Sequence, residues 1–175
     1  LGGSILPSES DPVILEFDLY LPASGGPNWQ DARQFCEIRG YSGGVLGEGD
    51  LRSLVSMGLY NVSGDPFSTQ RYQGRVWTPE NPGPEAWHTL DNAPHEPVRR
   101  SGWHRLRVEV APQQVKFRVD GSLAETVERS SNHPFDTVLL GSDLTCNGLS
   151  FQIDNVLVSG LAPHICADPG VDVAA

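Results

Sequence analysis

The sequence predicts an all-β protein built as an antiparallel sandwich or barrel, and two observations carry this prediction. Apolar residues recur at every second position through a series of short segments, which is the spacing of half-buried strands. Glycine and proline, 19 and 14 of the 175 residues, separate these segments and favour turns over long helices. No stretch has the apolar spacing of an amphipathic helix, and about nine short strands without intervening helices are typical of antiparallel sandwiches and barrels.

Four strands are expected in the first half of the chain, after an irregular N-terminal arm at residues 1–12. The first strand has the clearest pattern, because Val13, Leu15 and Phe17 share one face while Glu16 and Asp18 share the other. The four alternating runs cover residues 13–21, 33–41, 51–59 and 69–77.

A long surface connection is expected at residues 78–101, because its prolines remove backbone donors and restrict their neighbours. A short strand is expected within it, at residues 87–90. Long ordered loops are often functional, so Trp87, His88 and His95 are candidate ligand contacts.

The best-defined unit begins at residue 102. Residues 103–110 and 115–119 alternate, and Asp120-Gly121 is the strongest short-range signal for a two-residue hairpin turn. Burying the apolar rows of both strands requires the pairs 110–115, 108–117 and 106–119, since a slip of one residue would turn a row outward. The turn is then expected to pair Phe117 with Ala124 and Lys116 with Glu125, which places Lys116 between Glu109 and Glu125.

Two further strands are expected at residues 136–141 and 149–158. The apolar phase of the second one shifts at Asp154-Asn155, which indicates a bulge or an inward-facing polar residue. The predicted organisation is therefore an arm at residues 1–12, a single domain at 13–160 and an extended C-terminal tail at 161–175.

The net charge of the chain disfavours some classes of binding partner. Acidic side chains number 22 and basic ones 12, for a net charge of −10, which disfavours nucleic acid and anionic membrane surfaces. No apolar run is long enough to span a membrane. Leu1 in the first position is compatible with a removed signal peptide or with a piece of a longer chain, and the first of these predicts a secreted or periplasmic location.

The three cysteines, Cys36, Cys146 and Cys166, leave two alternatives open. A Cys146–Cys166 disulfide would tie the tail to the domain. Alternatively, all three thiols are reduced and mostly buried. None of them has the spacing of a haem-attachment motif or of a structural zinc site.

Two segments carry a family resemblance, Gly102-Trp103-His104-Arg105-Leu106-Arg107-Val108-Glu109-Val110 and Val115-Lys116-Phe117-Arg118-Val119-Asp120-Gly121. They resemble the concanavalin A-like lectin/glucanase superfamily, and in particular the laminin-G-like jelly-roll modules of secreted bacterial proteins. Phe151-Gln152-Ile153-Asp154-Asn155-Val156-Leu157-Val158 is similar to the final strand of that family. The resemblance covers residues 102–159 and implies an antiparallel jelly-roll β-sandwich. It leaves function open, since the superfamily holds lectins, binding modules, hydrolases, lyases and adhesion domains.

The catalytic motifs of the superfamily are incomplete in this chain. Its glucanases carry Glu-x-Asp-x-x-Glu on one strand, because an acid and a nucleophile must flank the scissile bond, and here only Glu16 and Asp18 form a weak pair. Glu37-Ile38-Arg39 resembles the end of the Arg-x-Glu-Leu-Arg strand of alginate-type lyases, but their Gln-x-His strand and tyrosine-rich motif are missing. His104 shares the parity of Leu106 and is expected to be a core or strand-end histidine.

Sugars in related jelly rolls commonly lie along the concave sheet, so the resemblance implies a binding site there. Aromatic rings stack on sugars, while arginine, glutamine and glutamate form hydrogen bonds with hydroxyls or carboxylates. The candidate residues for this sheet are Phe35, Glu37, Arg39, Tyr41, Tyr60, Arg71, Gln73, Arg75 and Trp77. The alternative is a polar, solvated sheet with cross-strand ion pairs such as Glu37–Arg75.

A structural Ca²⁺ is the one cofactor that the resemblance suggests, since several members hold the ion with oxygen ligands from loops and terminal strands. Asp154 and Asn155, with Glu16 and Asp18 from the first strand, could supply such ligands if the first and last strands are neighbours. The alternative is that Asp154 stabilises a bulge by hydrogen bonding.

These observations predict a non-catalytic, extracytoplasmic binding module, with carbohydrate on the concave sheet as the leading ligand. One alternative is an accessory subunit that docks on a larger protein assembly, such as a membrane-anchored one, through residues 78–101 and the terminal arms. A polysaccharide lyase or hydrolase is the third possibility.

Overall fold

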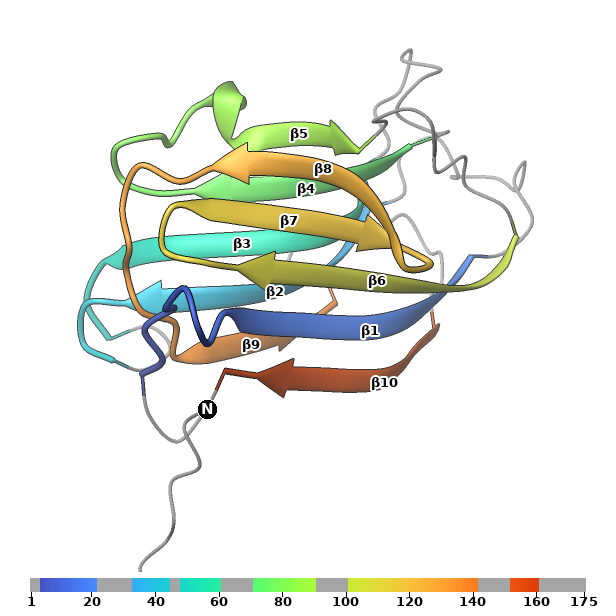
Figure 1. Cartoon of the computed structure of the whole chain (residues 1–175), viewed down its shortest axis with the longest axis horizontal. Coiled ribbons are helices and arrows are strands. Elements are labelled where there is room, and N and C mark those ends of the chain that lie inside the picture. Colours follow the sequence, from blue (N-terminus) through green and yellow to red (C-terminus); the bar gives the residue numbers. More distant parts are fainter. Residues whose placement is uncertain are drawn as a thin grey trace, which may run out of the picture.

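A computed structural model describes residues 4–21, 33–44, 48–60, 71–90, 101–141 and 152–160, and in these ranges ten strands form two five-stranded sheets. All strand pairs are antiparallel, and the two sheets face each other as the layers of a sandwich (Figure 1). The predicted fold class, an antiparallel jelly-roll β-sandwich, is confirmed. No helix in the described ranges is long and apolar enough to cross a membrane.

The front sheet in Figure 1 has the order β10-β1-β6-β7-β8. These strands are β10 (Gln152–Ser159), β1 (Val13–Leu21), β6 (Gly102–Val110), β7 (Gln114–Val119) and β8 (Ser122–Glu128). The back sheet has the order β5-β4-β3-β2-β9. These strands are β5 (Trp87–Leu90), β4 (Tyr72–Trp77), β3 (Leu51–Tyr60), β2 (Arg33–Tyr41) and β9 (Thr137–Leu140), and a short 3₁₀ turn, η2 (Pro84–Ala86), precedes β5.

The core lies between the sheets and follows from the alternation of apolar residues. All five odd-numbered positions of β1 are buried, as are the apolar rows of β6 and β7 that pair with them. The back sheet opposes them with buried residues such as Ile38, Met57 and Tyr72. Each large apolar side chain buried in this way contributes about 1.5–3 kcal/mol, so the alternation itself drives the two sheets together.

The expected hairpin between β6 and β7 is confirmed, because Val110 pairs with Val115 and Val108 with Phe117. The register predicted for β7 and β8 is correct for the first two residue pairs after the turn and wrong beyond them. Phe117 lies opposite Glu125, not Ala124, and Lys116 lies opposite Thr126, because a bulge follows the Asp120-Gly121 turn. The bulge has a packing reason: Ala124 remains buried while Val127 also faces the core, whereas the regular register would have turned Val127 outward.

The phase shift expected in the last strand is confirmed as a bulge. β10 pairs with β1 in two registers, with Glu16 opposite Leu157 but Asp18 opposite Asp154. Asn155 takes a positive φ of 50° in the bulge. The extra residue allows Ile153 and Val158, five positions apart, both to pack against the core.

The described part of the N-terminal arm, residues 4–12, contains no strand or helix, but one of its residues is fixed against the sandwich. Ile5 forms an isolated bridge with Phe135 through two backbone hydrogen bonds of 2.6 and 2.8 Å, and its side chain is buried. The tail at residues 161–175 lies outside the described residues, as does the stretch 91–100 of the long connection.

Candidate functional site

The outer face of the back sheet gathers most of the residues that the sequence singled out for binding. Since directly paired residues of antiparallel strands point to the same side, the register sets out rungs of side chains across this face. One rung runs Glu37–Ser56–Arg75–Trp87 across β2, β3, β4 and β5. We call this surface the aromatic–arginine face, and its residues are Arg33, Phe35, Glu37, Arg39, Ser56, Tyr60, Gln73, Arg75, Trp77, Trp87 and Thr89.

Trp87 is the centre of an aromatic cluster on this face. Its ring centroid lies 4.7 Å from that of Tyr60 and 5.4 Å from that of Phe35. Phe35 and Tyr60 complete the triangle at 6.2 Å. The cluster brings together β2, β3 and β5 across the sheet, and next to Tyr60 the outer side of β3 carries two small residues, Ser56 and Gly58. Trp87 and Tyr60 are both partly exposed.

Two arginines lie over these rings. The Cζ atom of Arg75 is 4.8 Å from the ring centroid of Trp87, and that of Arg33 is 4.8 Å from the ring centroid of Tyr60. Such cation–π contacts hold a guanidinium by one face, and the Nε atoms of both arginines are buried. Arg71, which directly precedes β4, adds another guanidinium at the start of that strand.

The middle of the face is polar and also buried. Glu37 is 6% exposed and accepts a hydrogen bond of 2.7 Å from Nε of Arg39, its neighbour on the same side of β2. Gln73 and Thr89 face each other across β4 and β5 at 3.4 Å. The Oγ atom of Ser56 is fully buried and has no hydrogen-bond partner among the residues that the structure describes.

Some predicted site residues lie elsewhere. His88 pairs with Gly74, which faces the core, so its side chain belongs to the inner side of β5, opposite to Trp87. Burial lowers the pKa of His88, and the nearby charge of Glu125 opposes this effect only in part. His95 lies outside the described residues.

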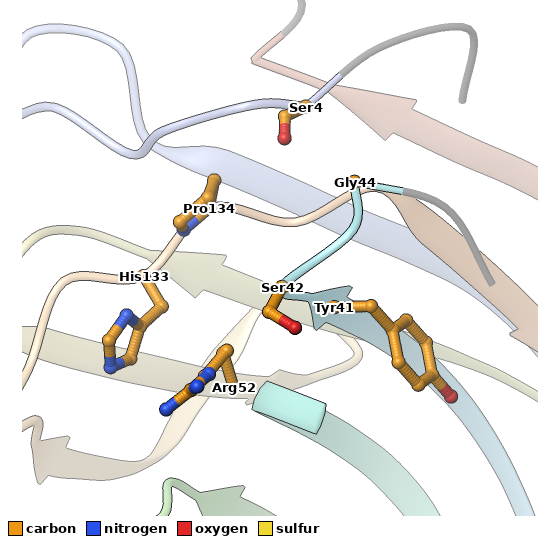
Figure 2. A pocket seen from close by; sticks show the side chains of 7 residues that line it. All are labelled: Ser4, Tyr41, Ser42, Gly44, Arg52, His133 and Pro134. Carbon is orange, nitrogen blue, oxygen red and sulfur yellow. The ribbon is translucent and has the colours of Figure 1, made fainter. Parts of the chain in front are cut away.

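Tyr41 lines a separate pocket at the end of the sandwich (Figure 2). This pocket has a volume of about 320 Å³. Its lining comes from three distant segments, as Ser4, Tyr41, Ser42, Gly44, Arg52, His133 and Pro134. Figure 2 shows the ring of Tyr41 pointing away from Arg52 and His133. Except for Tyr41, the sequence did not single out these residues for binding, because the segments that carry them come together only in the folded chain.

A buried cation lies next to that pocket. Arg129 is 6% exposed, and its guanidinium donates hydrogen bonds to the carbonyls of Ala111 and His133 and to the side chains of Ser53 and Asn132. Burial lowers the pKa of Arg129 to about 10, so the side chain is still charged at neutral pH. It thereby ties β3, the β6–β7 loop and the segment after β8 to one another.

The acidic residues proposed for calcium lie on the opposite, front sheet. Asp18 receives two hydrogen bonds from Arg105, at 2.9 and 3.2 Å, and one of 2.7 Å from the amide of Asn155. The hydrogen bonds from Arg105 hold the pKa of Asp18 below its ordinary value. Glu16 pairs with Arg107 at 3.0 Å. Within the described ranges no three His, Cys, Asp or Glu side chains are grouped to hold a metal, and calcium binding stays a prediction.

Asp154 follows the alternative expectation. Its Oδ1 atom accepts a hydrogen bond of 2.7 Å from the backbone N–H of Asn155, within the bulge. His104 also follows expectation as a strand-end histidine, with Nδ1 at 2.8 Å from Asp120. Cys36 is a buried free thiol whose pKa burial raises to about 12. Cys146 and Cys166 lie outside the described residues, so the disulfide expected between them stays a prediction.

No protein-family model and no curated protein matches the chain. Among solved structures, it is similar to a Bacillus licheniformis beta-glucanase, with a TM-score of 0.49 and 16% identity over 85% of this chain. It spans 66% of the glucanase chain. It is also similar to a variant of human galectin-16, with a TM-score of 0.44 and 13% identity over 89% of this chain and 92% of that one. A third is sheep galectin-11 in complex with glycerol, with a TM-score of 0.41 and 11% identity over 86% and 95% of the two chains.

Proposed function

We propose that this protein is a non-catalytic carbohydrate-binding module and that its site is the aromatic–arginine face. One observation carries the proposal: Trp87 presents a partly exposed ring, packed against Tyr60 and overlaid by the guanidinium of Arg75. A sugar ring offers apolar C–H groups on its faces and hydroxyls around its rim. A rigid aromatic surface beside fixed hydrogen-bond donors matches both of these features.

The arrangement of the face supports a platform that exists before the ligand arrives. Trp87 is held by contacts to Phe35 and Tyr60, and Arg75 is held over its ring. A ligand that meets side chains already fixed in place loses less of its binding energy to ordering them. The strands themselves, rather than the loops, supply these residues.

The distribution of carboxylates favours binding over hydrolysis. Glycoside hydrolysis normally needs two carboxyl groups on either side of the scissile bond, about 5 Å apart in retaining enzymes and further apart in inverting ones. Glu37 is the one acidic residue that the described strands of the back sheet carry, and it is engaged by Arg39. Glu16 and Asp18 lie on the other sheet, each paired with an arginine.

Screening the purified chain on a glycan array, followed by calorimetric titration of the best soluble oligosaccharide, tests the proposal. Trp87→Ala should weaken binding by about tenfold or more, as expected when an aromatic anchor is truncated. The matched control is Trp103→Ala, since Trp103 is exposed on the front sheet and should leave affinity unchanged.

Arg75→Gln serves as a second variant in case Trp87→Ala disturbs the packing around Phe35. Circular dichroism and the urea midpoint confirm that each variant is folded. Absence of binding to every glycan would overturn the proposal, and so would binding that Trp103→Ala abolishes while Trp87→Ala and Arg75→Gln leave it intact.

A further inference from the structure

We infer that the carbohydrate bound by the aromatic–arginine face is an anionic polysaccharide, one that carries carboxylate or sulfate groups. This inference rests on the proposed function and narrows its ligand class. It comes from the difference in charge between the two sheets of one sandwich.

The back sheet is basic although the chain as a whole carries a net charge of −10. Its five strands contain four arginines, Arg33, Arg39, Arg52 and Arg75, and one acidic residue, Glu37, a net charge of +3. The strands of the front sheet contain six acidic and four basic residues, a net charge of −2. The acidic ones are Glu16, Asp18, Glu109, Glu125, Glu128 and Asp154, and the basic ones are Arg105, Arg107, Lys116 and Arg118.

The arginines of the two sheets also have different surroundings. On the front sheet Arg105 pairs with Asp18, Arg107 with Glu16 and Glu109, and Arg118 with Glu109. In that network three arginines and three carboxylates balance one another, mostly across neighbouring strands. On the back sheet Arg39 pairs with Glu37, and Arg52 pairs with Asp50, which directly precedes β3, whereas Arg33 and Arg75 lie over aromatic rings.

A face with more arginines than carboxylates favours anionic glycans over neutral ones. A neutral glycan needs donors and acceptors in similar numbers for its hydroxyls, whereas a guanidinium has five N–H donors and no acceptor. Carboxylate and sulfate groups accept paired hydrogen bonds from a guanidinium, with about twice the strength of neutral hydrogen bonds. The front sheet, whose strands carry a net charge of −2, repels a polyanion, so the basic back sheet also orients the encounter.

Polymer pairs that differ in charge but share a backbone make the test direct. The probes are polygalacturonate against its methyl ester, carboxymethylcellulose against hydroxyethylcellulose, and dextran sulfate against dextran. Affinity gel electrophoresis should show retardation by the charged member of at least one pair and little or none by the neutral member. Retardation should fall as salt is raised, since the Debye length shortens from about 10 Å at 0.1 M to about 3 Å at 1 M.

Two variants with the same change of charge locate the effect. Arg75→Gln should lower affinity for the charged polymer by about tenfold or more, because it removes a donor fork from the face. Arg118→Gln, which removes an arginine from the ion-pair network of the front sheet, should change affinity by less than about twofold.

The outcomes separate this inference from the function on which it rests. Equal retardation by both members of a pair, unaffected by salt, overturns the anionic class and leaves carbohydrate binding standing. If no charged probe binds but a neutral oligosaccharide binds in a Trp87-dependent way, the anionic class is again overturned and carbohydrate binding again stands. Failure of all probes and of the glycan array overturns both. Equal losses in Arg75→Gln and Arg118→Gln would show non-specific attraction and overturn the assignment to this face.

Discussion

Gly74 of β4 lies against the ring of Phe117 of β7, at the point where the two sheets approach each other. A Cβ atom placed on Gly74 would come within 2.7 Å of Cζ and 2.9 Å of Cε1 of that ring. Phe117 is fully buried, so the ring cannot move into solvent. The missing side chain at position 74 therefore sets the spacing of the sheets beneath Trp87 and Arg75.

The first prediction follows from this contact. Gly74→Ala should lower the free energy of unfolding by about 1–3 kcal/mol, because it overpacks a closed core. The Gly74→Ala/Phe117→Leu double variant should lose less than the sum of the two single variants, with a coupling of about 0.5 kcal/mol or more. Urea unfolding followed by tryptophan fluorescence measures all three. Strict additivity would contradict the contact.

A second prediction compares two serines on β3. Ser53 accepts a hydrogen bond from Nη2 of Arg129 at 3.4 Å, whereas Oγ of Ser56 has no partner in the described ranges. Both side chains are buried. Ser53→Ala should cost about 1 kcal/mol, since it leaves a charged donor unsatisfied, while Ser56→Ala should be neutral or stabilise by up to about 1 kcal/mol. The same urea titration checks both, and a larger loss in Ser56→Ala than in Ser53→Ala would be inconsistent with this assignment.

The third prediction concerns the buried cation. Arg129→Met should lower the free energy of unfolding by about 2 kcal/mol or more, because the carbonyls of Ala111 and His133 lose a charged donor. Arg118→Met is the control, since that side chain is 31% exposed and its loss should cost less than about 1 kcal/mol. Thermal unfolding at several scan rates gives the comparison. Equal losses in the two variants would argue against a structural role for Arg129.

The fourth prediction is a pH dependence. Hydrogen bonds from Arg105 lower the pKa of Asp18 in the folded protein, so the unfolded state takes up its proton first as the pH falls. The stabilisation is complete above the pKa of an unfolded aspartate, about 3.9, and is lost as the pH falls through the lower folded value. Asp18→Asn should therefore be less stable than the parent chain at pH 7, and the difference should shrink progressively as the pH falls below about 3.9. Urea midpoints at four pH values measure it, and a difference that is as large in acid as at pH 7 would refute this account.

Much of the fold could be predicted because its strands are locally regular. β1, β7 and the second half of β6 bury every second residue, and the Asp120-Gly121 turn defines the hairpin of β7 and β8. The β7–β8 register could not be obtained in this way. Its bulge exists because Ala124 and Val127 both pack against the core, and that preference depends on the opposing sheet rather than on neighbours in sequence.

The candidate site was predictable to a similar extent and for similar reasons. Glu37 and Arg39 are two residues apart, as are Gln73 and Arg75. Side chains two residues apart in a strand point to the same side, so the sequence alone predicts that each pair shares a face. The part played by Trp87 could not be read in this way, because its cluster joins three strands through Gly58 and Ser56. Arg33 was missed although it shares the parity of Phe35, since it stands at the first position of its strand.

The bulge in β10 has a consequence for how the molecule behaves in concentrated solution. β10 is an edge strand, and an edge strand presents unpaired N–H and C=O groups to any extended segment nearby. The positive φ of Asn155 interrupts this row, so a neighbouring chain would meet two short ladders out of phase instead of one continuous ladder. The irregularity that brings Ile153 and Val158 into the core thereby also makes the outer edge of β10 a poor template for an added strand.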